Sequence, residues 1–215
     1  GEMASGKPHG KGKTVYKNGD TYEGEYVKGR RQGYGVYTFS DGEKYEGEWF
    51  QDQQHGRGTY HFMNNNKYVG LWFRDYQQGH GVMWYYNGDK YDGDWYQDKR
   101  TGKGTYTYSG GAYYTGEWKD DKKTGKGFFD WGDGTTYDGM WLDNLRSGKG
   151  TNHYADGDVY IGDWLDDVQN GSNTSSSNAT YRKPSMFFFD HSANVDELMR
   201  HQFAKINTHE ISQEV

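Results

Sequence analysis

The side chains best suited to metal binding or proton transfer in this chain are its eight histidines. They do not have the spacing of a metal-ligand set: His9 and His55 precede paired glycines, His80 lies between two glycines, and the others are scattered. Cysteine is absent, which excludes disulfides, thiolate zinc sites and a cysteine nucleophile. The sequence therefore predicts no metal site.

Carboxylates and glycine-rich segments are spread too regularly to indicate catalysis. Asp and Glu recur along the whole chain, so the closeness of any two of them carries no information. The phosphate-binding P-loop motif does not occur, and the many GxG pairs lie in strand-like segments without the helix that a dinucleotide fingerprint requires. We therefore expect no catalytic residue, no cofactor and no enzymatic activity.

A basic side chain recurs between the paired glycines and could bind phosphates or anionic lipid headgroups. These positions are Lys11, Arg57, His80, Lys103, Lys126 and Lys149. The acids expected opposite them are Glu48 with Arg57, Asp94 with Lys103, and Glu117 with Lys126. Such cross-strand ion pairs contribute at most about 1 kcal/mol each, but they neutralise the stripe. We therefore expect a solvated, salt-bridged face here, and a lipid site is the alternative.

The segments that carry these residues repeat every 23 residues without insertion. Each opens with a tyrosine, has a glycine two residues later, and has an aromatic residue two after that. The opening residues are Tyr22, Tyr45, Tyr68, Tyr91, Tyr114, Tyr137 and Tyr160; the aromatic residues are Tyr26, Trp49, Trp72, Trp95, Trp118, Trp141 and Trp164. A fixed period of this length indicates a repeat array in which each unit buries one face on its neighbours.

Each unit is predicted to be a pair of strands. Residues 45–49 alternate an aromatic or glycine with an acid, and residues 56–62 alternate in the same way, as strands with one apolar face do. The expected cross-strand pairs are Trp49 with Gly56, Gly47 with Gly58, and Tyr45 with Tyr60. All six then share one face, where the glycines leave room for the rings of neighbouring units.

A polar residue followed by glycine links one unit to the next, as at Asp41-Gly42. A two-residue hairpin here would send the aromatics of adjacent units to opposite faces. A three-residue loop, with the glycine left-handed and a bulge, pairs Tyr37 with Tyr45 and keeps one aromatic face. We expect this loop. Asn65 replaces the glycine once and is the next best left-handed residue.

The composition agrees with an aromatic repeat array. The chain of 215 residues has 33 Gly, 21 Tyr and 8 Trp, and a net charge of −6. Aliphatic residues are too sparse for a conventional core, so rings packed on glycine must form it. The acidic balance argues against broad nucleic-acid binding, and no apolar run is long enough to span a bilayer.

The unit closely resembles the MORN repeat (membrane occupation and recognition nexus). The best matches are YEGEW at 45–49 with HGRG at 55–58, and YTGEW at 114–118 with TGKG at 124–127. The resemblance implies an all-β fold, an elongated single-layer twisted antiparallel sheet of stacked β-hairpins. It also implies a non-catalytic scaffold or interaction module.

The resemblance covers residues 9–171 and divides the chain. We expect a flexible leader over 1–8, then a half unit at 9–21, units at 22–44, 45–67, 68–90, 91–113, 114–136 and 137–159, and a half unit at 160–171. A Ser/Asn-rich linker and a Phe-rich segment follow over 172–193. An amphipathic helix is expected over 194–208, because Asn194 and Glu197 can form a capping box.

Within this family, a short chain that is nearly all repeats with a brief tail resembles the small MORN proteins of the ciliary radial spoke head. That resemblance implies a cytoskeletal location, in the axoneme of a cilium or flagellum. The expected partners are other spoke head proteins, a MORN paralogue or a second copy. Two alternatives remain: a membrane scaffold that binds anionic phospholipids, and an adaptor that grips a helical peptide at Trp72 or Trp95.

Partner contacts are expected on the aromatic face and in the tail. The residues of the aromatic face are Tyr45, Trp49, Tyr68, Trp72, Tyr91, Trp95, Tyr114, Trp118, Tyr137 and Trp141; those of the tail are Phe187, Phe188, Phe189, Leu198 and Phe203. We expect the tail helix to fold back over the last hairpin, or to dock on a neighbouring subunit. The three phenylalanines are too apolar to leave in water and suit a partner-binding anchor.

Overall fold

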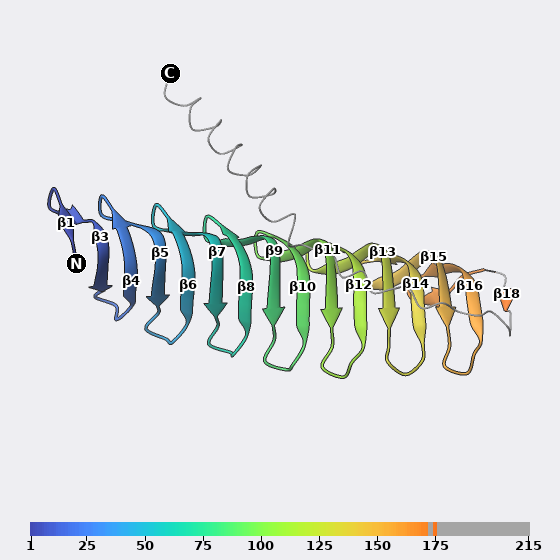
Figure 1. Cartoon of the computed structure of the whole chain (residues 1–215). Helices are drawn as coiled ribbons and strands as arrows, with labels where there is room; N and C mark the ends of the chain where they lie inside the picture. Colours follow the sequence, from blue (N-terminus) through green and yellow to red (C-terminus); the bar gives the residue numbers. More distant parts are fainter. Residues whose placement is uncertain (172–173, 176–215) are drawn as a thin grey trace, which may run out of the picture. The chain divides into compact units, whose positions relative to one another are not determined.

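The computed structural model describes residues 1–171 and 174–175, which form strands joined by short turns (Figure 1). In chain order the strands are β1 (Met3–Ala4), β2 (Lys7–Pro8), β3 (Gly10–Val15), β4 (Thr21–Val27), β5 (Arg30–Thr38), β6 (Lys44–Phe50), β7 (Gln53–His61), β8 (Lys67–Phe73), β9 (Tyr76–Trp84), β10 (Lys90–Tyr96), β11 (Lys99–Thr107), β12 (Tyr113–Lys119), β13 (Lys122–Asp130), β14 (Thr136–Leu142), β15 (Leu145–His153), β16 (Val159–Leu165), β17 (Val168–Gln169) and β18 (Thr174–Ser175).

Strands β3 to β17 lie side by side in chain order, each antiparallel to the next, in one sheet (Figure 1). β18 joins the same sheet by pairing with β16. The predicted all-β fold, a single layer of stacked antiparallel hairpins, is confirmed. The predicted helix at 194–208 lies outside the described residues, and so does most of the segment 172–193 before it.

The alternation of rings and acids along each strand sets the register inside a hairpin. Tyr45 lies opposite Tyr60 and Gly47 opposite Gly58, as predicted. The same two pairings recur in the following hairpins, for example Gly116 with Gly127. Rings and glycines therefore share one face along the whole array.

The pairing predicted for Trp49 is wrong. Trp49 lies opposite Gln54 rather than Gly56, because the register shifts between Gly47 and Trp49. Three residues of β7 then face the single residue Glu48, which makes a β-bulge, and Gly56 adopts a φ of 61° there. Glycine suits this left-handed conformation, which side chains disfavour. Period-two reasoning missed the shift because residues 56–62 keep their alternation beyond the bulge.

The turn inside each hairpin has two residues with positive φ. In the second unit these are Gln51 at 49° and Asp52 at 71°, and in a later unit Asp120 at 48° and Asp121 at 68°. Two successive left-handed residues make a type I′ turn, whose twist matches that of the flanking strands. The sequence did not reveal this turn, because only two copies, Ser5-Gly6 and Lys28-Gly29, contain the glycine that usually signals it.

The loop between units is the predicted three-residue loop. Tyr37 pairs with Tyr45, and the backbone N–H of Phe39 donates to the carbonyl oxygen of Glu43 at 2.9 Å. Gly42 takes the left-handed position with a φ of 99°, and Asn65 takes it in the next unit with a φ of 65°. This loop preserves the aromatic face from one unit to the next.

Short strands lie at both ends of the array. The segment predicted as a leader contains β1 and β2, which pair with each other, and the N–H of His9 donates to the carbonyl oxygen of Glu2 at 2.9 Å. At the other end, β17 and β18 both pair with β16. The outer edge of β16 therefore does not present a fully unpaired backbone, which would invite aggregation.

Candidate interaction groove on the aromatic face

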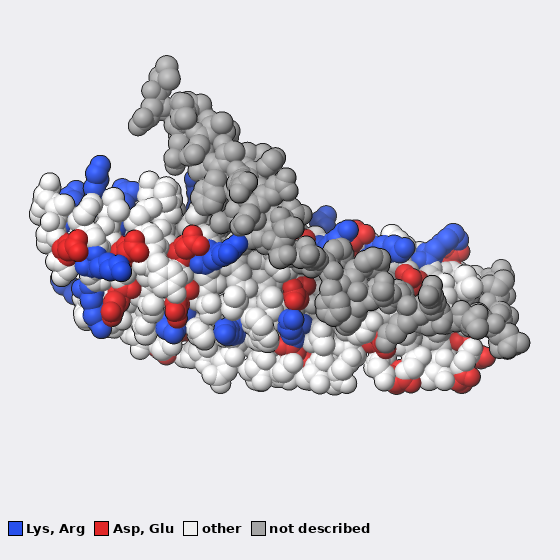
Figure 2. Space-filling model, in the orientation of Figure 1, with Lys and Arg blue, Asp and Glu red and all other residues white. Residues whose placement is uncertain are grey.

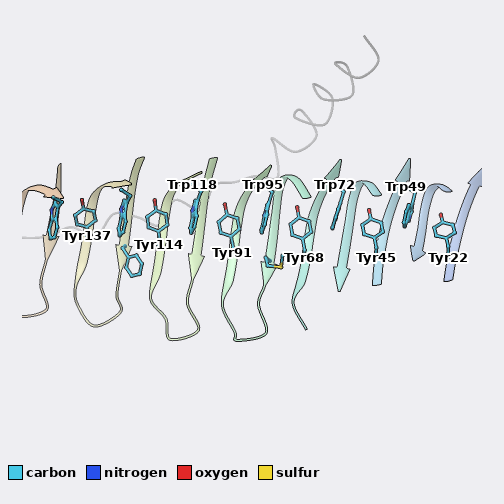
Figure 3. Close-up of a cluster of buried hydrophobic side chains, with 14 of the residues drawn as sticks. Tyr22, Tyr45, Trp49, Tyr68, Trp72, Tyr91, Trp95, Tyr114, Trp118 and Tyr137 are labelled. Carbon is cyan, nitrogen blue, oxygen red and sulfur yellow. The ribbon is translucent and has the colours of Figure 1, made fainter. Parts of the chain in front are cut away.

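The repeated tyrosines form the innermost layer of the aromatic face (Figure 3). Each one from Tyr22 to Tyr137 is fully buried, with its ring lying over a pair of facing glycines. The hydroxyl group of Tyr45 donates to the carbonyl oxygen of Glu48 at 2.9 Å, and its equivalents make the same bond. Burial disfavours the tyrosinate, and it raises the pKa of Tyr137 to about 12.

The repeated tryptophans lie between these tyrosines, so that the two kinds of ring alternate along the sheet (Figure 3). Trp72 meets Tyr68 and Tyr45 edge to face, with ring centroids 5.3 Å apart in both cases. Its indole N–H donates to the carbonyl oxygen of Gly58 at 3.3 Å. Edge-to-face contacts of this kind add roughly 0.5–1.5 kcal/mol beyond the area they bury. They join neighbouring units into one stack.

The structure brings together all ten residues predicted for the aromatic face, but it gives them little surface. The tyrosines among them are 0% exposed and the tryptophans 4–6%. The rings available at the surface belong to a second row that packs against the first and includes Tyr37, Tyr60, Phe62, Tyr85 and Tyr106. The five residues predicted for the tail lie outside the described residues.

Acidic residues from the loops hold the second row in place. The hydroxyl group of Tyr37 donates to Asp20 at 2.6 Å, and that of Tyr106 donates to Asp89 at 2.7 Å. The bond from Tyr37 helps to hold the pKa of Asp20 below its usual value, and burial together with the same bond raises the pKa of Tyr37 to about 12. Each such pair joins the loop of one unit to a strand of the next.

A cation covers the tryptophan ring in four of the repeats. The charged group lies over the ring centroid at 4.2 Å for Arg31 and Trp49, 4.7 Å for Arg100 and Trp118, 4.5 Å for Lys123 and Trp141, and 4.0 Å for Arg146 and Trp164. We call this place above the ring the cation position. Burial lowers the pKa of Lys123 to about 8.

Two consecutive repeats have glutamine where the others have Arg or Lys. Gln54 and Gln77 occupy the equivalent places in the 23-residue register, next to Trp72 and Trp95. A groove of about 800 Å³ lies at these two repeats. Its lining is Phe39, Gln54, Tyr60, Phe62, Trp72, Asp75, Gln77, Met83, Tyr85, Trp95, Asp98, Arg100 and Asp121. Sequence analysis could have found the place by comparing the residues 23 apart at this one position of the unit.

The acids predicted to pair with the basic stripe have another role. Glu48 accepts the backbone N–H of Arg57 at 3.0 Å, Asp94 that of Lys103 at 3.0 Å, and Glu117 that of Lys126 at 3.1 Å. These carboxylates hold the bulge described above, so the direct opposition predicted for the three pairs is wrong. Elsewhere on the stripe Lys149 pairs with Asp163 at 3.1 Å. Acidic and basic side chains are interleaved on the face shown in Figure 2.

Other kinds of site are not found in the part of the chain that the structure describes. Residues 1–171 and 174–175 contain no group of three or more His, Cys, Asp or Glu side chains placed to hold a metal ion. The same residues include no helix with the length and apolar character needed to cross a membrane.

The comparisons with solved structures and curated proteins give limited help. The SAS-4 TCP domain of Drosophila melanogaster, solved with a proline-rich motif of Ana2, is 11% identical, with a TM-score of 0.43 over 70% of this chain and 88% of that one. The TCP10 domain of Danio rerio CPAP, solved with a STIL peptide, is 15% identical, with a TM-score of 0.41 over 77% and 83%. With TM-scores this low, neither likeness bears on function. No curated protein matches the chain.

The family comparison is decisive. The MORN repeat matches eight successive segments, which are residues 1–21, 22–44, 45–67, 68–90, 91–113, 114–136, 137–159 and 160–172. These segments have the period found in the sequence, and they cover most of the chain and nearly all the described strands. The chain therefore belongs to the MORN repeat family.

Proposed function

We propose that this protein is a non-catalytic scaffold that binds other proteins through its aromatic face. The observation that carries the proposal is the groove at Trp72 and Trp95. It combines ring surface with a few polar side chains, and its volume suits the side chains of a peptide. The buried ring stack beneath it supplies a preorganised floor, which lowers the entropic cost of binding.

We propose further that the scaffold serves in the radial spoke head of motile cilia or flagella. The support is the uninterrupted run of eight MORN repeats, which resembles the small MORN proteins of that assembly. Its partners would be other spoke head proteins, a MORN paralogue or a second copy. A membrane scaffold has less support, because charges of both signs are interleaved along the sheet.

The test is a native pull-down of the tagged full chain from ciliated cells, with mass spectrometry of salt-washed eluates. We expect spoke head and axonemal proteins, and we expect Phe62→Ser in the groove lining to lose at least one of them. Tyr96→Ser is the matched control, because Tyr96 is exposed and lies outside the groove. Recovery of membrane proteins alone, or of nothing that survives the salt wash, would contradict the proposal.

A further inference from the structure

The cation position is a recurrent binding site that this chain fills with its own side chains in four repeats. In three of those repeats the cation is an arginine held by an aspartate of the following hairpin turn. The Nε of Arg100 donates to Asp121 Oδ1 at 2.9 Å, and that of Arg146 donates to Asp167 Oδ1 at 3.0 Å. The site thus consists of a tryptophan face and an aspartate.

The arginine also binds the backbone of the same turn. A terminal guanidinium nitrogen donates to the backbone carbonyl oxygen of Asp52 at 2.7 Å from Arg31, and to that of Asp121 at 3.1 Å from Arg100. A planar guanidinium can stack on a ring and donate several hydrogen bonds at once, whereas an ammonium group cannot match this geometry. The site is therefore built for arginine.

The two glutamine repeats keep the backbone half of this arrangement. The N–H of Gln54 donates to Asp75 Oδ1 at 2.8 Å, and that of Gln77 donates to Asp98 Oδ1 at 2.8 Å. Both aspartates are therefore oriented as Asp121 is. Among the described residues, no Lys or Arg lies over Trp72 or Trp95 in the way that Arg100 lies over Trp118. Tryptophan and aspartate are thus both in place, and no Lys or Arg of residues 1–171 takes the cation position.

The charge of the groove favours a cationic occupant. Among the described residues, its lining includes Asp75, Asp98 and Asp121 but one cation, Arg100, and this arginine already contacts Asp121. The aromatic side chains that complete the lining attract a cation through their ring faces. A cationic side chain that enters would meet the same groups that Arg31 and Arg146 meet within the chain.

We propose that the groove binds an arginine-bearing segment of a partner protein, whose guanidinium groups take the cation positions over Trp72 and Trp95. This inference rests on the proposed scaffold function and names the chemistry of its partner. Adjacent repeats are two strands apart, which is roughly 10 Å. A polyproline II segment advances about 9 Å in three residues and returns to the same side. Two arginines separated by two residues in such a segment match the two positions.

The test uses the purified full chain and a blocked synthetic peptide, PPRPPRPP, with binding measured by calorimetry. We expect the peptide to bind, and we expect a peptide with citrulline in place of both arginines to bind at least roughly tenfold more weakly, because citrulline is a neutral isostere. The variant with both Gln54→Arg and Gln77→Arg should weaken binding by a similar factor. Its new arginines restore the pattern of the other repeats, so the fold is expected to persist.

The matched control is Gln51→Arg. It adds one positive charge, where the double variant adds two, at an exposed turn position at which the next repeat has Arg74 with nearly the same φ. This control should bind PPRPPRPP as the unchanged chain does. Circular dichroism and the thermal midpoint of each variant check that it is folded.

Four results would overturn the inference. They are no binding of PPRPPRPP, equal binding of the citrulline peptide, undiminished binding to the double variant, or weakening by Gln51→Arg as strong as that by the double variant. A fifth result would show that the occupant is a segment of this chain. If replacing Arg182, Lys183, Arg200 and Lys205 by neutral residues tightens peptide binding more than tenfold, the chain's own tail competes with the peptide for the groove, and a partner protein is the wrong occupant. If the peptide fails but the pull-down recovers protein partners, the scaffold function stands and only the partner chemistry is wrong.

Discussion

At the scale of single residues, the contact that matters most is a tyrosine ring lying over two facing glycines. A Cβ atom built on Gly58 would lie 2.5 Å from Cε2 of Tyr45, and one on Gly47 would lie 2.5 Å from the Cα of Gly58. Neither the backbone nor the fully buried ring has room to move away. These glycines stabilise the array because the absence of a side chain leaves the space that the tyrosine ring fills.

We predict that Gly58→Ala lowers the free energy of unfolding by about 1–3 kcal/mol, the usual cost of overpacking. The measurement is urea denaturation followed by tryptophan fluorescence. Gly110→Ala is the control, because a Cβ there meets nothing within 4 Å and the six other copies of this loop position all have Asp or Asn. The idea fails if the two substitutions cost the same.

The buried tyrosines also predict how stability depends on pH. Burial raises the pKa of Tyr37 and Tyr137 to about 12, whereas tyrosines of the unfolded chain titrate near 10. Above about pH 10 the folded state therefore binds more protons than the unfolded state, and the free energy of unfolding falls as the pH rises. Below that pH the contribution of these tyrosines is fully present.

Denaturation curves and tyrosinate absorbance at increasing alkaline pH check this prediction. Lys123 has the opposite effect, since its pKa is lowered to about 8, but that effect is complete once unfolded lysine has titrated near pH 10.4. A decline above that value therefore reports the tyrosines. A denaturation midpoint that stays constant up to pH 12 would show that their burial does not govern alkaline stability.

Sequence reasoning succeeded for residues that obey the repeat and missed those that depart from it. The pairing of Tyr45 with Tyr60 follows from period two alone, and it was confirmed. The departure at Gln54 and Gln77 was missed, because a glutamine is unremarkable until the cation at the same position of other repeats is seen to lie over a ring. The exposed fraction of the tryptophans also needed three dimensions, since neighbouring rings bury one another.

At the scale of elements, successive hairpins are joined by a reciprocal bridge between a turn and a strand start. The N–H of Asp121 donates to the carbonyl oxygen of Arg100 at 3.1 Å, and the N–H of Arg100 donates to Asp121 Oδ1 at 3.1 Å. The bridge recurs from the turn at Asp52 to the turn at Asp167, with Asn144 in place of aspartate once. It connects the ends of hairpins that the sheet ladder leaves unpaired.

We predict that Asp121→Gly lowers the free energy of unfolding by about 1–2 kcal/mol. Glycine keeps the left-handed turn but removes the carboxylate that binds Arg100, and partial exposure of the pair moderates the loss. Asp121→Asn should cost less than about 0.5 kcal/mol, because Asn144 makes the same backbone contact at a φ of 75°. Equal losses in urea denaturation of the two variants would contradict this role.

The two kinds of connection differ in how far sequence could specify them. The three-residue loop was predicted from parity: only an odd loop keeps Tyr37 and Tyr45 on one face. The type I′ turn and the bulge at Gly56 each keep the alternation of the strands, because the turn has two residues and the bulge adds two residues to one strand. Their sum preserves the alternation that periodicity reports, so periodicity could not reveal either of them.

At the scale of the whole array, each unit is stabilised by its contacts with the adjacent units alone. From β4 to β15 each strand pairs only with the strands before and after it in the chain. Distant units of the described sheet are not coupled by direct contacts. They are connected through the continuous stack of rings. Such arrays behave as a sum of unit and interface contributions.

We therefore predict that the effect of Gly58→Ala stays local. Hydrogen exchange measured by mass spectrometry should speed up in β6 to β9, whereas β15 and β16 should exchange as in the unchanged chain. The reason is that no strand of the described sheet connects these regions except through the units between them. Uniformly faster exchange across the array would show that it unfolds as one cooperative block.

The odd loop between units has a further consequence, which concerns how such a chain can change length. Adding or deleting one residue in that loop would turn every downstream ring to the opposite face, as a frameshift changes every downstream codon. Whole repeats can be duplicated or lost without this effect, since each carries its own turn, bulge and loop. The array thus has a period of 23 residues, and the gain or loss of whole repeats changes its length without turning any ring to the other face.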